Sequence, residues 1–484
     1  MKVNYLQEKT PLFDALLAYV QELPVSCHVP GHKNGTIFHE AGKEIYEQLL
    51  KIDATEIDGL DDLHAPEGPI LEAQLLLSQL YKSERSYFVI NGSTCGNLAA
   101  VMGVCDEDDV VLVQRNCHKS VLHGLMLAKA KPIFLKTIYN EEWGIAEGIS
   151  PQTVKAALKK YPQAKALILT YPNYYGVGEY IEELITLAHQ SDLTVIVDEA
   201  HGAHFVAGKP FMSSSLIYGA DYVIQSAHKS LPAMTMGSYL HMNYGAKNME
   251  KVELYLRMLQ SSSPSYPIMA SLDLARSFVG TLSRADVEYT KENISSFINQ
   301  LNKVDGLKVM RRPEDICDIL KVTIQTDGTF TGYELQSKLN EQGVYVELAD
   351  PCNILLVLPI LKVGQDYSYT KIVNDIQKAV ALLKAEDREK YIFPVIEDGD
   401  VMTELALSFS EMNSRQTKLI EIAFAENYIA AETITPYPPG IPYIMNGERL
   451  SKRKIAYLQS ILKLGAKFHG GIELKTKQQI LVYI

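Results

Sequence analysis

Short runs of β-branched and other apolar residues alternate with helical patterns from about residue 87 to residue 225. The runs are YFVIN (87–91), VVLVQ (110–114), PIFLK (132–136), ALILT (166–170), TVIVD (194–198) and YVIQ (222–225). Helical patterns begin at Gly96 and at Lys119, and another runs through EELITLAHQ. Strands separated by helices of this length predict parallel βαβ units, with helices on both faces of one mostly parallel sheet.

The pattern changes beyond about Asn293. A helix, an apolar run at 319–325, a second helix at 333–342 and the runs VYVELA and NILLVLP predict a smaller α+β domain. The charged stretch KAEDREK (384–390) precedes a third region with helical patterns. We predict an α/β protein of three domains: an N-terminal segment with a large domain (1–290), a small α+β domain (291–388) and a C-terminal α+β domain (389–484).

Composition narrows the class of protein. Of the 484 residues, 47% are apolar and 21% are charged, which is ordinary for a soluble globular protein. The first residues lack a signal-peptide pattern, and no uncharged apolar run reaches the roughly 20 residues of a membrane span. The six cysteines form no C-x-x-C pair, so neither a disulfide framework nor a zinc cluster is indicated. We predict a cytoplasmic protein with reduced cysteines and no membrane partner.

The net charge of −12 bears on possible partners. A nucleic-acid binder would present a basic face to the phosphates, so we expect no nucleic-acid partner. The acidic balance is compatible with a cationic small substrate.

Ligands of such sheets gather at the carboxyl ends of the strands, so the residues after each run are informative. Gly92, Ser93 and Thr94 follow the first run. Glycine and small hydroxyls at a strand-to-helix junction leave backbone N–H groups free for an anion such as a phosphate. The same residues are also typical of a plain turn and helix N-cap.

His118 and Asp198 follow two other runs. His118 is either a neighbour of a helix N-cap or an aromatic plate on a ligand ring. A carboxylate after a strand as apolar as TVIVD is costly unless a cation meets it. Asp198 therefore indicates either a metal site with His201 and His204, or a salt bridge to a protonated ring nitrogen of a cofactor. The glycine between the two histidines and the absence of an HExxH pattern favour the cofactor and no metal.

Lys229 lies in the stretch QSAHKSLPA, directly after YVIQ. A single lysine is most often a solvated surface residue. Beside hydroxyls and a histidine in a partly dry crevice, its ammonium would be destabilised and the amine could act as a nucleophile. An anion cradle, an aromatic plate, a buried acid and a lysine at successive strand ends are the parts that hold pyridoxal 5′-phosphate.

The chain resembles the bacterial ornithine/lysine/arginine decarboxylase family of fold-type-I pyridoxal-phosphate enzymes. The motifs that carry the resemblance are VPGHKNG (29–35), TEIDGLDDLHAPEG (55–68), NGST (91–94), QRNCHKS (114–120), VDEAHGAH (197–204), SAHKSLPA (226–233), SSSPSYPIMASLD (261–273) and TPYPPGIP (435–442). They span most of the chain. The resemblance implies decarboxylation of arginine, lysine or ornithine to agmatine, cadaverine or putrescine, the amines of polyamine biosynthesis.

The resemblance also implies roles for single residues. Lys229 forms the Schiff base with pyridoxal phosphate, Asp198 pairs with the pyridine nitrogen and His118 stacks on the ring. The phosphate is held by Ser93, Thr94, Ser226 and His228. His201 lies near the cofactor hydroxyl or the substrate carboxylate. A homodimer, or an oligomer built on it, places the active site at the subunit interface, where Ser263 and Tyr266 serve the neighbouring site.

Two features differ from the family pattern. Larger inducible members carry an N-terminal wing domain, whereas the PGHK motif begins here almost at once, so we expect neither that domain nor assembly through it. The lysine motif reads SAHKSLPAMTMGS, where many members have a threonine before the histidine. The choice among the three substrates is therefore open. Asp58, Asp61, Asp62 and Glu67 are candidates for guiding the distal cation, or else are solvated or helix-capping carboxylates.

Three rival functions remain. An aminotransferase or another lyase of the same fold would need an arginine for the α-carboxylate. A non-catalytic protein could bind the cofactor for stability alone. A metal hydrolase would use Asp198, His201 and His204.

Overall fold

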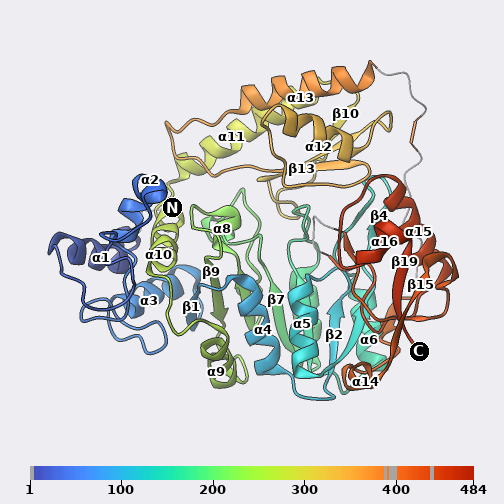
Figure 1. Ribbon diagram of the computed structural model, residues 1–484, viewed down its shortest axis with the longest axis horizontal. Coiled ribbons are helices and arrows are strands. Elements are labelled where there is room, and N and C mark those ends of the chain that lie inside the picture. The colour runs from blue at the N-terminus through green and yellow to red at the C-terminus, as the bar shows by residue number, and fades with distance from the viewer. Residues whose placement is uncertain (1–4, 386–389, 392–399, 437–440) are drawn as a thin grey trace. The chain divides into compact units, whose positions relative to one another are not determined.

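The computed structural model describes residues 5–385, 390–391, 400–436 and 441–484. The chain divides into two compact units, each formed by two separate stretches of sequence. The first unit comprises residues 1–104 and 194–284, and the second comprises residues 105–193 and 285–484. Both are drawn in Figure 1, where colour follows the chain from blue to red.

The first unit contains helices and four strands of a mixed sheet. Its elements are η1 (Tyr5–Glu8), α1 (Pro11–Gln21), α2 (Glu40–Lys51), α3 (Pro69–Tyr81), β1 (Arg85–Val89), α4 (Gly92–Val104), β7 (Thr194–Asp198), η2 (Phe205–Ala207), η3 (Ser215–Tyr218), β8 (Tyr222–Gln225), α8 (Ala227–Ser230), β9 (Ser238–Met242), α9 (Met249–Leu259) and α10 (Tyr266–Gly280). The strands lie in the order β1-β9-β8-β7.

Strand direction in the first unit brings three strand ends to one edge. Strand β9 is antiparallel to both β1 and β8, so β1 and β8 run in the same direction. Strands β7 and β8 are parallel, and Asp198 pairs with Ile224. The residues that follow β1, β7 and β8 therefore emerge at the same edge of the sheet.

The sequence of helix α4, GSTCGNLAAVMGV, consists almost entirely of small and apolar residues. The helix therefore has no strongly polar face. It packs against α9 and against strands β8 and β9. A Cβ atom at Gly96 would lie 2.9 Å from Cγ2 of Ile224, closer than carbon atoms pack. Glycine at this position allows the first turn of α4 to approach the end of β8.

A buried ion pair anchors the N-terminal segment to α10. Arg276 and Asp273 are both fully buried, and their Nη2 and Oδ1 atoms lie 2.7 Å apart. Arg276 also donates to the backbone carbonyls of Gln7 and Lys9, while Asp273 accepts from the backbone N–H of Leu12 at 3.1 Å. The pair thus satisfies backbone groups at the entrance to α1.

We expect the Arg276→Ala substitution to lower the free energy of unfolding by about 3–5 kcal/mol, because it leaves the Asp273 carboxylate buried without a cation. Urea unfolding followed by circular dichroism measures this change. The exposed Arg257→Ala on α9 is the matched control and should change stability by less than about 0.5 kcal/mol. Equal stabilities of the two variants would contradict the anchoring role.

The second unit holds four further strands of a mixed sheet and several small sheets. Its elements as far as the small α+β region are β2 (Val110–Gln114), α5 (Lys119–Ala128), β3 (Lys131–Leu135), β4 (Tyr139–Asn140), β5 (Ile145–Ala146), α6 (Pro151–Lys160), β6 (Ala166–Thr170), α7 (Ile181–Gln190), α11 (Arg284–Leu301), β10 (Leu307–Val309), β11 (Lys321–Thr326), α12 (Gly332–Glu341), β12 (Leu348–Ala349), β13 (Asn353–Val357) and α13 (Tyr369–Lys384). Its C-terminal elements are β14 (Met402–Glu404), α14 (Phe409–Ser414), β15 (Thr417–Glu421), η4 (Ile422–Phe424), β16 (Ile429–Ala430), β17 (Thr435–Pro436), α15 (Lys452–Lys463), β18 (Phe468–His469), α16 (Ile472–Lys477) and β19 (Gln479–Tyr483).

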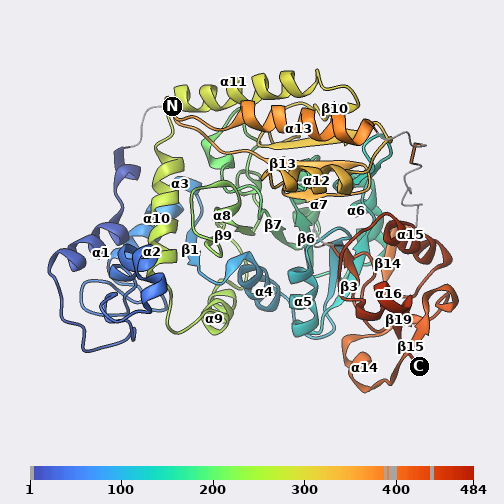
Figure 2. The same ribbon diagram turned by 45° about the horizontal axis from the view of Figure 1, so that its top comes forward.

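The sheets of the second unit differ in character. Strands β6, β2 and β3 are parallel, and β14 adds to β3 in the antiparallel sense. The antiparallel sheet β10-β11-β13-β12 has helices α11, α12 and α13 around it (Figure 2). The C-terminal sheet β15-β19-β16 packs with α15 around a core that includes Ile434, Ile444 and Leu458.

Most predicted elements are present with shifted bounds. Helix α4 begins at Gly92 rather than Gly96, because Gly92 adopts φ +77° and turns the chain directly from the strand end into the helix. The run VYVELA forms only the two-residue strand β12. The predicted stretch KAEDREK and motif TPYPPGIP lie partly outside the described residues, at 386–389 and 437–440. Within the described ranges, no helix has the length and apolar character to cross a membrane.

Candidate active site

The residues predicted to bind an anion lie in the first turn of α4 and at Ser226. The Ser226 hydroxyl donates to Oγ of Ser93 at 2.8 Å, so the strand ends of β1 and β8 bring these two predicted residues together. Thr94 follows Ser93 in the first turn and is exposed. The backbone N–H of Gly92, the first residue of the 13-residue helix α4, donates to the Met236 carbonyl at 3.0 Å. The dipole of α4 favours negative charge at this end.

The predicted carboxylate, Asp198, ends β7 and is 4% exposed. It accepts from Nδ2 of Asn97 at 2.9 Å and from the backbone N–H of Ala200 at 3.2 Å. No lysine, arginine or histidine in the described part of the chain forms an ion pair with it. A carboxylate buried without a cation is costly, so this site is suited to a positively charged group of a ligand.

Asn97 was not predicted from the sequence. It lies one helical turn after Ser93, on the face of α4 that leads from the strand end toward Asp198. A single amide in a helix of otherwise small and apolar residues is the signal that could have identified it.

The predicted nucleophile, Lys229, lies in the short helix α8 directly after β8. Its Nζ is 3.2 Å from Nε2 of His201, which is 7% exposed. The amine and the imidazole can therefore exchange a proton directly. His228, one residue earlier, donates through Nδ1 to the backbone carbonyl of Gly237 at 2.9 Å, which fixes its ring orientation.

His118 belongs to the second unit, where it caps the N-terminus of α5. Its Nδ1 accepts the backbone N–H of Ser120 at 3.2 Å and faces the Ser120 hydroxyl at 2.8 Å. The sequence placed His118 beside a helix N-cap, and in the structure it is the N-cap itself. Its stacking on a cofactor ring stays a prediction.

A buried polar network lies next to Asp198 and was also missed by the sequence analysis. Glu199 is fully buried and accepts from the Ser214 hydroxyl, from the backbone N–H of Ser215 and from Nε2 of Gln225, each at 2.7 Å. Burial raises the pKa of Glu199 to about 7 in spite of these donors. Oε1 of Gln225 in turn accepts from Nε2 of His241 at 3.1 Å. The network fixes the chain after β7 to the strands beside it.

The same network predicts a pH dependence of stability. Burial lowers the pKa of His241 to about 3, so the folded protein keeps this ring neutral at a pH where the unfolded chain protonates it. The contribution of His241 is present above about pH 6.5 and is lost at about 1.4 kcal/mol per pH unit as the pH falls below that value. Glu199 acts in the opposite sense, because its raised pKa favours the folded state as the pH falls from about 7.

We therefore expect the unfolding free energy of wild type to fall relative to that of His241→Gln as the pH falls from 7 to 5. The variant lacks the imidazole ring that must stay neutral in the folded state. Urea unfolding at pH 5, 6 and 7 measures this shift. Met258→Gln, at an exposed position on α9, should follow wild type at every pH. A constant difference between wild type and His241→Gln would contradict the burial argument.

The residues of the metal alternative do not form a metal site in the structure. His204 is fully buried, and its ring packs edge-on against Phe205 and Phe211 at 4.8 and 5.0 Å between centroids. Throughout the ranges that the structure describes, no three His, Cys, Asp or Glu residues are grouped to hold a metal ion.

The acidic loop before α3 has a structural role. The Asp61 carboxylate accepts the backbone N–H groups of Asp62, Glu67, Gly68, Ile70 and Leu71. Asp61 thus satisfies the N-terminus of α3, which is the helix-capping alternative considered for this stretch. Tyr266, one of the residues expected to serve a neighbouring subunit, is buried and donates its hydroxyl to the Asp61 carbonyl.

Comparison with solved structures identifies the fold as that of fold-type-I pyridoxal-phosphate enzymes, as expected from the sequence. The structure of the Escherichia coli constitutive lysine decarboxylase aligns with a TM-score of 0.81 and 22% identity, covering 99% of this chain and 82% of that chain. A structure described as SPT with PLP aligns with a TM-score of 0.52 and 17% identity, covering 72% of this chain and 84% of that chain.

Sequence comparison then identifies the family. The Orn/Lys/Arg decarboxylase major domain matches residues 10–325, and the C-terminal domain of the same family matches residues 396–475. An arginine decarboxylase of Bacillus anthracis is 33% identical, covering 96% of this chain and 95% of the relative. The uncharacterized protein YaaO of Bacillus subtilis (strain 168) is 43% identical, covering 98% of each chain. The chain belongs to the Orn/Lys/Arg decarboxylase family, and the resemblance drawn from its motifs is confirmed.

Proposed function

We propose that this enzyme is a pyridoxal-phosphate-dependent decarboxylase that converts a basic amino acid to its amine and CO₂. The candidate substrates are arginine, lysine and ornithine, and the products are agmatine, cadaverine and putrescine. The observation that carries the proposal is the buried Asp198 carboxylate, which has no cationic partner in the described residues and ends the strand parallel to the one that precedes Lys229.

The residues of the first unit fit pyridoxal phosphate. Asp198 would meet the protonated ring nitrogen, and the hydroxyls of Ser93 and Ser226 with the N-terminus of α4 would meet the phosphate. Thr94 and His228 complete the proposed phosphate site. The stacking of His118, a residue of the second unit, on the ring rests on the family resemblance alone. When bound, this cofactor supplies the electron sink that decarboxylation requires.

The chain's own groups have separate tasks in this proposal. Lys229 would hold the cofactor through its amine. His201, 3.2 Å from the Lys229 amine, takes up and returns the proton at Nζ. Asn97 orients the Asp198 carboxylate, whose charge would keep a proton on the ring nitrogen of the cofactor. The low exposure of Asp198 keeps water from weakening that interaction.

Arginine is the first substrate to test. The name arginine decarboxylase belongs to a relative that is 33% identical over 474 residues, whereas the inducible lysine decarboxylase of Escherichia coli (strain K12) is 26% identical.

The six cysteines are all free, in keeping with a cytoplasmic location.

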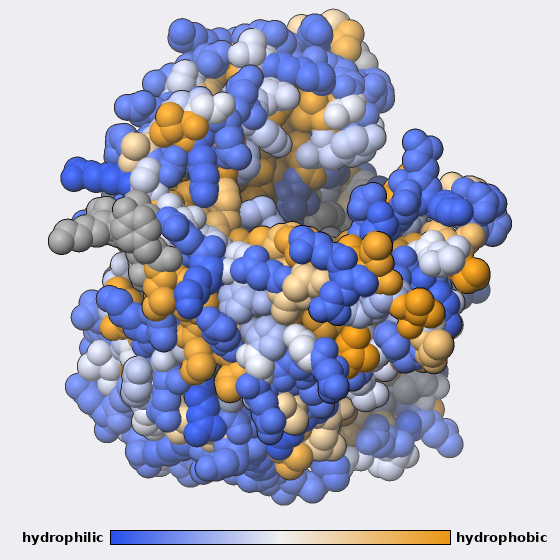
Figure 3. Space-filling view, turned by 90° about the vertical axis from the view of Figure 1, so that its left-hand side faces the viewer, coloured by the Kyte–Doolittle hydropathy of each residue, from blue (hydrophilic) through white to orange (hydrophobic). Residues whose placement is uncertain are grey.

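A homodimer with the active site at its interface is part of the proposal. The N-terminal segment exposes large apolar side chains, among them Leu23, Val25 and Ile45, each at least 81% exposed. Figure 3 shows hydrophobic side chains among hydrophilic ones on the face of the molecule that is seen there. An interface would cover such side chains. Sedimentation of the cofactor-loaded protein tests this part of the proposal.

The experiment that tests the proposed reaction is a substrate panel. The protein is purified with pyridoxal phosphate, and amine release from arginine, lysine, ornithine and citrulline is quantified by chromatography. We expect one of the three basic amino acids to be turned over and citrulline, which lacks the distal charge, to be inert. Inertness toward all three by protein that shows cofactor absorbance would overturn the proposal.

A further inference from the structure

A large cavity in the second unit contains none of the residues proposed for catalysis. Its volume is about 1210 Å³, and its walls come from the β4–β5 hairpin, the turn between β12 and β13, and helix α15 with the segment before it. Trp143 of the hairpin is buried with Leu348 and Leu355 of the small antiparallel sheet, so the hairpin wall is held in place. The cavity exceeds the few hundred cubic ångströms that a small ligand needs.

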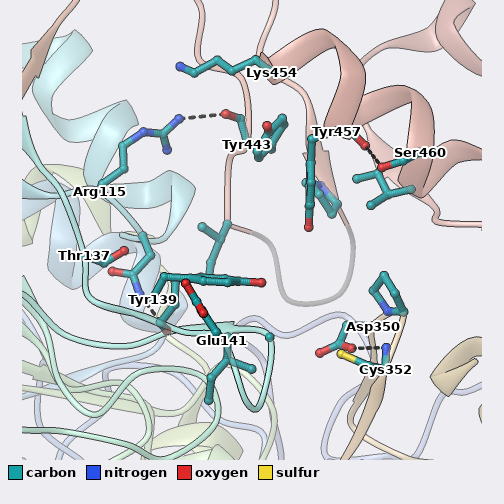
Figure 4. A pocket seen from close by; sticks show the side chains of 18 of the residues that line it. Arg115, Thr137, Tyr139, Glu141, Asp350, Cys352, Tyr443, Lys454, Tyr457 and Ser460 are labelled. Carbon is teal, nitrogen blue, oxygen red and sulfur yellow. Dashed lines mark hydrogen bonds between the residues drawn. The ribbon is translucent and has the colours of Figure 1, made fainter. Parts of the chain in front are cut away.

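Tyrosines form much of the wall. Tyr443 and Tyr457 lie with their ring centroids 4.8 Å apart. Figure 4 shows Tyr139 and Tyr457 bordering the open space from different elements, with their hydroxyl ends toward its interior. Neither the Tyr443 nor the Tyr457 hydroxyl has a hydrogen-bond partner among the residues that the structure describes. Tyr443 and Tyr457 therefore offer both aromatic faces and phenol hydroxyls to a ligand.

A carboxylate without a cation lies at the edge of this aromatic cavity. Asp350 accepts from the Tyr175 hydroxyl at 2.6 Å, from the backbone N–H of Cys352 at 2.8 Å and from Nδ2 of Asn353 at 2.9 Å. These donors orient the carboxylate but leave its charge unpaired, since no basic side chain of the described residues forms an ion pair with it. A second acidic side chain, Glu141 of the β4–β5 hairpin, lies beside Tyr139 (Figure 4).

The cavity wall contains five basic residues. Four of them are engaged by other groups or exposed, and the fifth, Lys136, is partly buried. Arg115 donates to the backbone carbonyls of Pro442 and Tyr443 at 2.8 Å, and with Lys454 it shares the Glu448 carboxylate. Lys452 and Arg453 are exposed. None of these four basic side chains forms an ion pair with Asp350 in the described residues.

We propose that this cavity is a second ligand site, which binds an aliphatic amine with its ammonium or guanidinium group between Asp350 and the rings of Tyr139, Tyr443 and Tyr457. Aromatic faces attract organic cations, and the partly buried Asp350 carboxylate supplies the matching charge. The substrates and products of the proposed reaction belong to this class, so the ligand comes either from that reaction or from another source of organic cations. The site itself does not depend on the proposed function.

Titration calorimetry of the full-length, cofactor-loaded protein tests the site. The probes are putrescine and agmatine for the reaction's own amines, tetramethylammonium for an unrelated organic cation, and inorganic phosphate as the opposite charge. We expect an amine to bind wild type and Tyr457→Leu to weaken binding about tenfold or more. Asp350→Asn should weaken it at least as much. Leu419→Ala, at an exposed position on β15, is the control and should bind as wild type does.

The outcomes separate this cavity from the proposed active site. Amine binding retained in Lys229→Ala and lost in Tyr457→Leu supports the second site, whatever the result of the substrate panel. Binding lost in Lys229→Ala and unchanged in Tyr457→Leu would assign the amine to the catalytic residues and overturn the inference. Binding of phosphate without binding of any amine or of tetramethylammonium would overturn it as well. Tyr457→Leu removes no hydrogen bond among the described residues, so circular dichroism should show it folded.

Discussion

The Lys229→Ala variant is expected to lose turnover by at least about 10³-fold, because it removes the only group assigned to hold the cofactor covalently and to exchange a proton with His201. The same change should abolish the visible absorbance of the lysine–cofactor linkage. Steady-state CO₂ release and an absorbance spectrum measure the two effects.

Two controls make the result on Lys229 specific. Lys209→Ala, at an exposed position of the same unit, should retain wild-type turnover and spectrum. Borohydride reduction of wild type followed by peptide mass spectrometry should place the pyridoxyl group on the peptide that contains Lys229. Retained decarboxylation by Lys229→Ala, or an adduct on another lysine, would show that the assignment is wrong.

Replacing Asp198 by asparagine is expected to lower kcat by about 10²-fold or more, since it removes the charge while keeping the side chain's shape and its contact with Asn97. The variant should still bind the cofactor, because the proposed phosphate site at Ser93 and Ser226 is unchanged. Cofactor titration and single-turnover measurements separate binding from the chemical step.

Asp198→Glu is the informative companion, because it restores the charge on a longer side chain and should recover part of the rate lost in the asparagine variant. The Asn97→Ala variant should lower the rate less than Asp198→Asn, since it only loosens the carboxylate. An unchanged kcat in Asp198→Asn would show that the charge of Asp198 does not contribute to the reaction.

The strand pattern of the large domain was predictable because apolar runs such as TVIVD are buried on both faces, so local composition and final environment agree. The short strand β12 was not, since four of the six residues of VYVELA lie in a loop in spite of their strand-forming composition. The start of α4 was predicted at Gly96 instead of Gly92. Gly92 has a positive φ, and sequence alone does not tell whether such a glycine lies in a turn before a helix or at the first position of the helix.

The candidate site was predictable to the extent that it follows strand ends. Asp198 ends β7, and Ser93 and Lys229 lie a few residues after β1 and β8. Because these three strands run in the same direction, the three residues come to one edge of the sheet. Asn97 and the network of Glu199 depend on packing between segments far apart in the sequence, which local patterns do not encode. The aromatic cavity depends on three such segments, and no motif marked Asp350 or Tyr457.

The proposed decarboxylation is tested most directly by tracing the carboxyl carbon of the substrate. The cofactor-loaded protein is incubated with arginine, lysine or ornithine labelled at the carboxyl carbon, and labelled CO₂ and amine are both quantified. We expect one labelled CO₂ and one amine for each molecule of one of these substrates that is consumed. Label retained in a 2-oxo acid without CO₂ release would indicate an aminotransferase and would contradict the account.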